Sequence, residues 1–167
     1  MLSKKKPKAF TILEVMIAML IVSLGLTAAI GLVISAFASS SFNTSKLIAA
    51  YLAQEGMEIV RNIRDSNWLA GNDWRDNLTD GDWEADYQAT SLNSCPSLCN
   101  YNDLHFLKID SNGFYNYNSG SVTNFKRKIT IGDGDANSFL VIVEVFWEER
   151  GKEYNLKAQE ILYNWNP

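Results

Sequence analysis

The sequence predicts an α+β protein in which one long N-terminal helix packs on a C-terminal antiparallel β-sheet. Two observations support this fold class. Residues 15–45 contain no charged side chain, and residues 104–163 alternate between short apolar runs and turns. The whole chain of 167 residues is about the size of one ordinary domain. We therefore expect a hydrophobic stalk followed by a small head that is polar, aromatic and acidic.

The uncharged run is long enough to cross a membrane as a helix. Residues 15–38 would extend about 36 Å at 1.5 Å per residue, against a hydrocarbon core of about 30 Å. Lysines at positions 4, 5, 6 and 8 precede the run, which predicts a cytoplasmic N-terminus and a head across the membrane. Ala36-Phe37-Ala38 fits a secretory cleavage site, but the run before it is longer than such signals have.

The charge of the head argues against nonspecific nucleic-acid binding. The net charge is −4 although the leader has four lysines, so the remainder is strongly acidic. Nucleic acid is bound through Lys and Arg that neutralise phosphates. The one basic cluster, Lys126-Arg127-Lys128, is interpreted as a solvated strand end. No nucleic-acid partner is expected.

A carboxylate stands at the edge of the apolar run. Glu14 would be costly near the membrane without a partner, unless its side chain reaches the headgroups. Its neighbours read Lys8-Ala9-Phe10-Thr11-Ile12-Leu13-Glu14-Val15. This segment resembles the class III signal of type IV prepilins and type II secretion pseudopilins. One departure is Ala9, because the family usually has Gly before the cleaved bond.

The resemblance implies the processing and assembly of that family. A prepilin peptidase would cut between Ala9 and Phe10, and the new amine of Phe10 would be N-methylated. Glu14 of an incoming subunit would then neutralise the Phe10 amine of a neighbour. The expected partners are other pilin subunits, the prepilin peptidase, the inner-membrane assembly machinery, and membrane lipid before assembly.

The function that the resemblance implies is that of a structural subunit, not an enzyme. Leu52-Ala53-Gln54-Glu55 followed by Met57-Glu58 also looks like PilV-type minor pilins, which favours a minor pilin of a type IV pilus. The subunit would sit in the inner membrane with its head outside, then in a surface fibre serving adhesion or a related task. Two alternatives stay open: a minor pseudopilin of a secretion system, and a monomeric membrane-anchored adhesive or binding domain.

The helix is expected to continue beyond the membrane. Ile48, Leu52, Ile59 and Ile63 form one apolar stripe, and Gly56 falls on it, which suggests close approach of the sheet. We expect the helix to run from Phe10 to about Ile63. The resulting segments are the leader (1–9), the hydrophobic half of the helix (10–38), its amphipathic half (39–65) and the head (66–167).

The head is expected to begin with an acidic loop over residues 65–86. Its tryptophans (Trp68, Trp74 and Trp83) are interpreted as a cover for the helix and sheet. Strands are expected at residues 104–109, 114–117, 125–131, 139–147 and 154–163, with Asn112-Gly113 as a hairpin turn. The last three strands should form an antiparallel meander.

The remaining chemistry of the head is sparse. Cys95 and Cys99 are the only cysteines, and a disulfide is plausible in an exported head. His105 is the only histidine, and no catalytic triad or zinc site can be drawn around it. We expect no cofactor.

A weak metal candidate lies in a turn near the C-terminus. Asp133, Asp135 and Asn137, with Glu144, match the spacing of EF-hand ligands. Ser138 stands where that loop needs glycine, and Glu144 falls in a predicted strand. A hairpin turn is therefore the favoured interpretation, and calcium binding is the weaker alternative.

Overall fold

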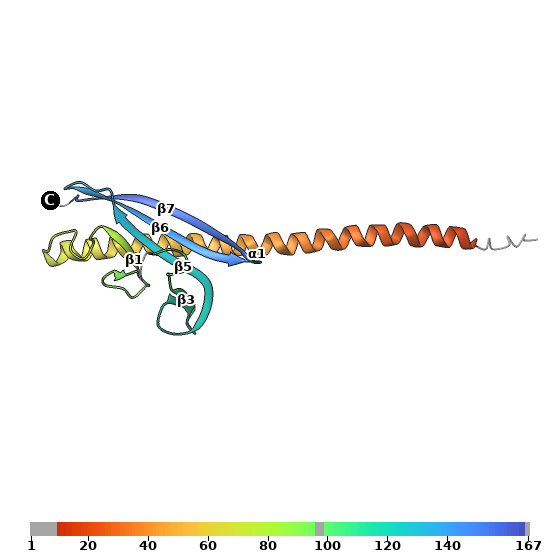
Figure 1. Ribbon diagram of the computed structural model, residues 1–167, viewed down its shortest axis with the longest axis horizontal. Helices are drawn as coiled ribbons and strands as arrows, with labels where there is room; N and C mark the ends of the chain where they lie inside the picture. Colours follow the sequence, from red (N-terminus) through yellow and green to blue (C-terminus); the bar gives the residue numbers. More distant parts are fainter. Residues whose placement is uncertain (1–9, 96–98, 166–167) are drawn as a thin grey trace, which may run out of the picture. The chain divides into compact units, whose positions relative to one another are not determined.

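A computed structural model describes residues 10–95 and 99–165, so the predicted leader and residue Ala9 lie outside the described residues. The chain divides into two compact units, with the boundary between Asn43 and Thr44. Helix α1 (Ile12–Ala70) supplies the described helix of the first unit and continues into the second (Figure 1). The second unit also contains every described strand.

Helix α1 begins and ends at sequence-specific caps. At its N-terminus the hydroxyl of Thr11 accepts a hydrogen bond from the Glu14 N–H at 3.2 Å. At its C-terminus Gly71 adopts φ 72°, and the bonds Gly71 N–H to Trp68 O and Asn72 N–H to Asn67 O close a Schellman motif. The prediction that the helix ends near Ile63 was therefore wrong.

The extra turns of α1 are held by polar contacts rather than by the apolar stripe. Asn67 is buried, and its amide donates to the backbone oxygens of Trp74 and Asp76 at 3.3 and 2.7 Å. The guanidinium of Arg64 lies 4.7 Å from the centre of the Trp68 ring. These contacts extend the helix through part of the segment predicted as a loop.

The strands of the described residues form one antiparallel sheet of seven. They are β1 (Gly81–Glu84), β2 (Asn93–Ser94), β3 (Phe106–Ile109), β4 (Tyr115–Asn116), β5 (Ser121–Gly132), β6 (Ser138–Glu149) and β7 (Lys152–Tyr163). One side of β5 pairs with β1 and β3, and β6 lies between β5 and β7. The α+β fold and the terminal meander are confirmed, whereas β1 lies where only a loop was predicted.

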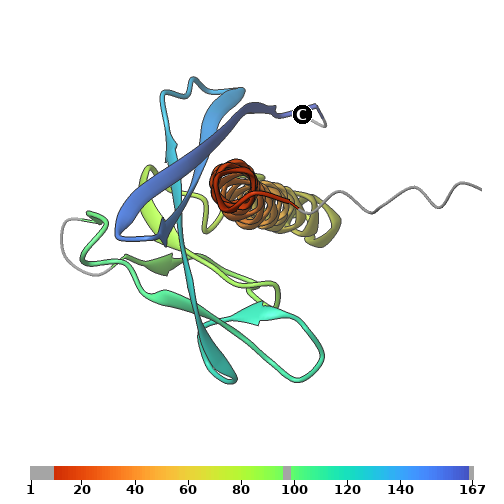
Figure 2. The same ribbon diagram turned by 90° about the vertical axis from the view of Figure 1, so that its right-hand side faces the viewer.

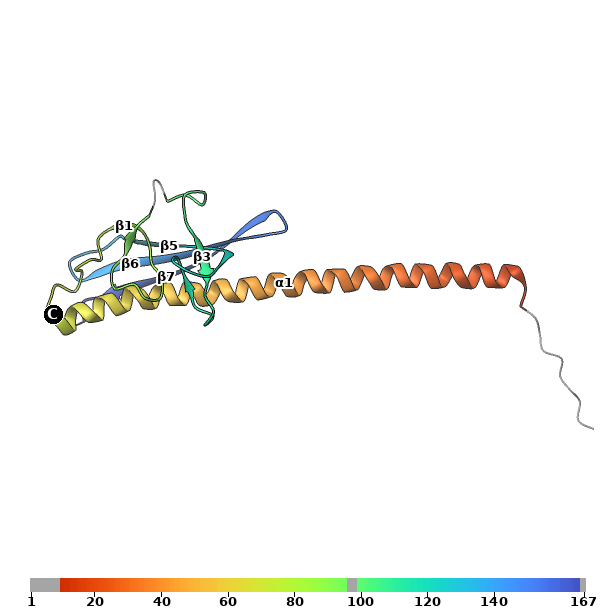
Figure 3. The ribbon, with the colours of Figure 1, turned by 90° about the horizontal axis from the view of Figure 1, so that it is seen from below.

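The core of the second unit lies between the C-terminal half of α1 and one face of the sheet. Alternate residues of β6 are almost fully buried: Phe139, Val141, Val143, Val145 and Trp147. They face the apolar stripe of the helix, in which Leu52, Val60 and Ile63 are buried. Figure 2 looks along the helix and shows the strands gathered on one side of the C-terminal half of α1, and Figure 3 shows the blue β6–β7 hairpin beside that half.

Gly56 lies where helix and sheet pack closely together. A Cβ at this position would lie 2.8 Å from Val143 Cγ1 and 3.2 Å from Arg127 Cδ. A real Cβ does not tolerate the first distance, so Val143 would have to move within a packed core. The expectation that Gly56 permits close approach of the sheet thus has a specific partner.

We expect Gly56→Ala to destabilise the head by up to about 2 kcal/mol, because an overpacking cost of about 1–3 kcal/mol outweighs the helix propensity gain of about 1 kcal/mol. Urea unfolding of the detergent-solubilised full chain, followed by tryptophan fluorescence, measures this change. Gly31→Ala is the matched control, since a Cβ there meets nothing within 4 Å. An unchanged or raised midpoint for Gly56→Ala would contradict the packing argument.

Candidate functional site

The N-terminal motif lies on an exposed helix surface in the first unit. Phe10 is 78 % exposed, and Glu14 lies in the first turn of α1, where the helix dipole favours a carboxylate. Together with Val15, Ala18 and Val22 they line a shallow, predominantly apolar groove. Among the described residues Glu14 makes no ion pair. The bond predicted to be cleaved involves Ala9 and is outside the described residues.

The apolar segment meets the requirements for a membrane span. Helix α1 contains a window that is long and apolar enough to cross a bilayer, and none of that window is buried within the structure. Its large side chains, such as Ile12, Met19 and Leu32, are more than half exposed. A soluble protein rarely leaves so continuous an apolar surface open, so this surface is suited to lipid or to other helices.

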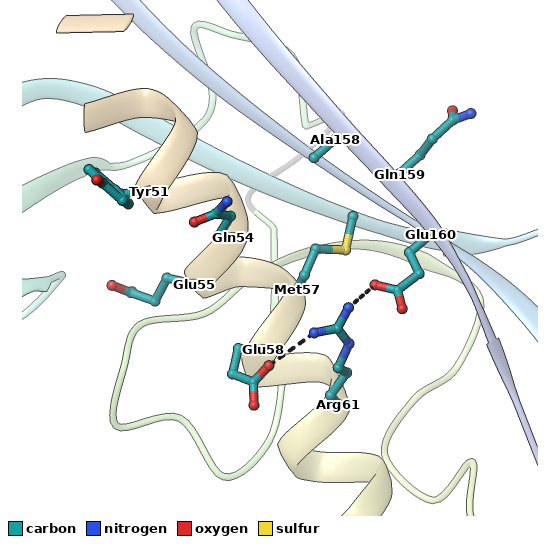
Figure 4. Close-up of a pocket in the computed structure, with 9 residues that line it drawn as sticks. All are labelled: Tyr51, Gln54, Glu55, Met57, Glu58, Arg61, Ala158, Gln159 and Glu160. Atoms are coloured by element: carbon teal, nitrogen blue, oxygen red, sulfur yellow. Dashed lines mark hydrogen bonds and ion pairs between the residues drawn. The ribbon is translucent and has the colours of Figure 1, made fainter. Parts of the chain in front are cut away.

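The second unit has a groove between α1 and β7. It has a volume of about 610 Å³ and is shown in Figure 4. The guanidinium of Arg61 donates to Glu58 Oε2 at 3.1 Å and to Glu160. The hydrogen bond that Arg61 donates to Glu160 is the largest cause of its raised pKa. Arg61 therefore stays charged and ties the helix to the edge strand.

A buried arginine connects three segments of the second unit through hydrogen bonds. Arg127 of β5 is completely buried. Its Nη1 donates to the Leu52 carbonyl and to Glu55 Oε1, both at 2.9 Å, and its Nη2 donates to the Ala85 carbonyl at 2.5 Å. Arg127 thus links α1, the chain after β1, and the sheet.

The prediction that the basic cluster is a solvated strand end was wrong, because Lys126, Arg127 and Lys128 lie inside β5 and each has a partner within the fold. Lys126 is buried, donates to the Tyr101 carbonyl at 2.7 Å and lies over the rings of Tyr101 and Phe106. Lys128 pairs with Glu144 across the sheet at 3.1 Å. The cluster is therefore used within the fold, which leaves it unavailable as a phosphate-binding surface.

A second polar network surrounds Tyr117. The His105 N–H donates to Glu84 Oε1 at 2.8 Å, and His105 Nδ1 lies 2.7 Å from Glu84 Oε2. Glu84 is buried on β1, so His105 satisfies a carboxylate that would otherwise lack hydrogen bonds. Burial of the neighbouring Tyr117 hydroxyl raises its pKa well above the usual value, and the charge of Arg127 opposes this rise. The role of His105 in this network is therefore structural: it holds the Glu84 carboxylate.

We expect the stability of the head to fall above about pH 10, and Tyr117 to cause much of that fall. An unfolded tyrosine loses its proton near pH 10. Since the folded pKa is raised, the unfolded state then binds fewer protons, and stability decreases by up to about 1.4 kcal/mol per pH unit. Tyr117→Phe should flatten the decline in denaturant midpoints between pH 9 and 11. Exposed Tyr163 gives the control variant Tyr163→Phe, and an equal slope in both variants would contradict the assignment.

The two cysteines lie close together in the structure. The Cα atoms of Cys95 and Cys99 are 5.6 Å apart, and their sulfurs are joined in the structure. Residues 96–98 between them are outside the described residues. Oxidation of this pair in the exported protein stays a prediction.

In the turn between β5 and β6, Asp135 Oδ1 accepts hydrogen bonds from the Asn137 N–H and the Ser138 hydroxyl at 2.8 and 2.9 Å. The first of these bonds is the main cause of a lowered pKa at Asp135. Glu144 is engaged by Lys128 instead. Across the part of the chain that the structure describes, no three His, Cys, Asp or Glu side chains are grouped to hold a metal ion. Calcium binding by Asp133, Asp135 and Asn137 stays a prediction.

Sequence reasoning missed two features of the second unit: the Arg127 anchor and the groove beside β7. The sequence of β5 contains a signal for the Arg127 anchor. Side chains two residues apart in a strand point to the same face, so Arg127 shares a face with the buried Phe125, Ile129 and Ile131. The groove depends on the pairing of helix and sheet, which no local pattern reveals.

Comparison with known proteins gives one match. Residues 4–30 match the family model described as the prokaryotic N-terminal methylation motif. No curated protein and no solved structure matches the chain. The matched segment contains the predicted cleavage site and Glu14. The chain therefore has the class III prepilin signal of the type IV pilins and pseudopilins, followed by a pilin-like α+β fold.

Proposed function

We propose that the chain is a structural subunit, and specifically a PilV-like minor pilin, of a type IV pilus. The methylation motif at residues 4–30 is the observation that supports this function. In this proposal residues 1–9 are a leader, residues 10–38 the stalk, residues 39–65 the amphipathic half of the helix, which α1 continues to Ala70, and the rest of residues 66–167 the head. Before assembly the subunit is anchored in the inner membrane with its head outside, and it is then incorporated into a surface fibre.

Charge pairing explains how the motif directs assembly. Cleavage before Phe10 removes the basic leader and creates an α-amine at the start of the apolar stalk. A charge in an apolar environment is costly unless it is paired. The carboxylate of Glu14 has no ion-pair partner among the described residues, and it lies one helical turn from Phe10. Pairing Glu14 with the amine of a neighbouring subunit satisfies both charges and selects one axial register.

The mass of the mature N-terminus tests this function. We expect cells with a prepilin peptidase to yield a chain that starts at Phe10 and has one added methyl group. A peptidase-deficient strain should yield the unprocessed chain with its lysines. Recovery of the full leader from both strains would instead support a monomeric membrane-anchored domain.

The pseudopilin alternative shares the same signal and needs a different measurement. Antibody labelling of fibres sheared from the cell surface should detect the subunit in extended surface pili. A subunit that is processed but stays with the secretion machinery of the envelope, and never appears on surface fibres, would assign the chain to the pseudopilins.

A further inference from the structure

Strand β7 is a long terminal strand of the sheet, and the edge considered below is its C-terminal part, residues 156–163. In the described part of the chain the strand pairs only with β6, over twelve consecutive residue pairs without a register shift. The other terminal strands, β2 and β4, have two residues each. A free edge presents a row of backbone N–H and C=O groups, and proteins protect such an edge with proline, a bulge or charged side chains. Strand β7 has no proline and no bulge, and its charged residues are two lysines and two glutamates, so its backbone stays regular and open to a strand of suitable charge.

The groove described above opens along this edge. Its walls are Tyr51, Gln54, Glu55, Met57, Glu58 and Arg61 of α1, and Ala158, Gln159 and Glu160 of β7 (Figure 4). Successive side chains of a strand point to opposite faces of the sheet. Ala158 and Glu160 face α1, since they pair with the buried Val143 and Val141 of β6, whereas Figure 4 shows the Gln159 side chain pointing away from the helix. The groove therefore lies on the helix-facing side of the β7 edge, where alternate side chains of an added strand would also point. A strand added to β7 would therefore place side chains in it.

The walls of the groove have an excess of negative charge. Three carboxylates (Glu55, Glu58 and Glu160) face one guanidinium, Arg61. Arg61 is shared between Glu58 and Glu160, and the side chain of Glu58 remains 70 % exposed. The buried Arg127 compensates only Glu55. A cationic side chain entering the groove would be complementary to these walls.

We propose that the β7 edge binds an extended, basic segment of another subunit, which adds one strand to the sheet and directs a Lys or Arg side chain into the groove. Extended backbone is the chemistry that satisfies a row of alternating donors and acceptors. A second β7 is the poorer occupant, because it has Glu153 and Glu160 as well as Lys152 and Lys157 and brings no excess of positive charge. The identification of the partner as another subunit rests on the proposed function. The binding of an extended segment to the β7 edge does not itself require polymerisation.

The test uses the detergent-solubilised full chain and two blocked peptides of about ten residues, one of alternating Val and Lys and one of alternating Val and Glu. We expect the Val/Lys peptide to bind at least about tenfold more tightly. Hydrogen exchange should slow in residues 156–163 when it binds, because added strand pairing protects edge amides. Absence of protection in β7 at saturating peptide would overturn the proposal.

Matched variants separate this edge from general attraction between a basic peptide and an acidic head. Ala158→Arg places a cation in the groove and should weaken Val/Lys binding about tenfold. Asn155→Arg adds the same charge on the opposite face of the same strand, where Asn155 pairs with Phe146, and should change it less than about twofold. If Ala158→Arg perturbs folding, Gln54→Lys on α1 makes the same test. Equal binding by the groove and control variants overturns the proposal.

Two further outcomes are distinguishable. Self-association of the full chain that Ala158→Arg abolishes, without binding of either peptide, would assign the edge to a second copy and overturn the proposed partner. Failure of the chain to polymerise in cells would remove the proposed function, yet peptide binding and β7 protection would still establish the edge site.

Discussion

The Glu14→Gln variant is expected to be inserted and processed normally but to enter fibres about 100-fold less than the wild type. Glutamine keeps the size of the side chain and removes its charge. The Phe10 amine of the neighbouring subunit then stays unpaired in apolar surroundings, at a cost of about 3 kcal/mol, which corresponds to about that factor. Immunoblots of sheared fibres and of the membrane fraction, with N-terminal mass measurement, report assembly and processing separately.

A local structural effect of Glu14 needs its own control. The backbone N–H of Glu14 donates to the Thr11 hydroxyl and caps α1, and this bond does not depend on the Glu14 side chain. Thr11→Val removes the cap, at about 1 kcal/mol, and leaves the carboxylate in place. Thr11→Val should therefore still assemble. Wild-type fibre content in Glu14→Gln would show that its charge is not used in assembly.

The stalk and the sheet were predictable because each depends on local pattern. An uncharged run of membrane length preceded by lysines has few other interpretations. In the sheet, Phe139, Val141 and Val143 alternate with half-buried residues, and short turns separate β5, β6 and β7. The hydrophobic period of a helix or strand and the residue types of a turn depend on residues that are close together in the chain, so the sequence alone was enough to predict these elements.

The features that escaped prediction depend on partners far away in the chain. Strand β1 is acidic and has little β propensity, yet Thr130 donates to Asp82 and His105 supplies the hydrogen bonds of Glu84. The last turns of α1 are held by Asn67, which bonds to the loop that follows. From the sequence alone, polar residues in β1 and in the last turns of α1 predict a loop, because their hydrogen-bond partners are not apparent. The stop signal, Gly71, is visible in the sequence, but the apolar stripe ends well before it, so the stripe alone predicts an earlier end of the helix.

The same reasoning applies to Glu14, whose partner is not in this chain's described structure at all. An exposed, unpaired carboxylate beside an apolar surface is a deficiency in a monomer and a specific contact in an assembly. Its role therefore follows from the family signal and from charge balance, and stands as a proposal.

Arg127→Ala is the substitution in the second unit with the largest expected effect, a loss of about 3–5 kcal/mol in the free energy of unfolding. The change removes the donors to Leu52, Glu55 and Ala85 and leaves a cavity between α1 and β5. The Ala85 carbonyl then lacks its side-chain donor in a dry interior, whereas Glu55 is partly exposed and can turn to water. The unsatisfied carbonyl and the cavity thus account for most of the loss.

Two comparisons show whether geometry or charge is the cause. Arg127→Lys keeps the charge, but one ammonium cannot reproduce the planar fork that reaches three oxygens, so most of the loss should remain. Lys157→Ala removes an exposed cation from the same sheet and should change stability by less than about 0.5 kcal/mol. Urea unfolding of each full-length variant in detergent, followed by tryptophan fluorescence, gives the three values. If Arg127→Lys is as stable as the wild type, the positive charge alone holds the helix to the sheet; if Arg127→Ala is as stable, the anchor contributes nothing and the apolar stripe suffices.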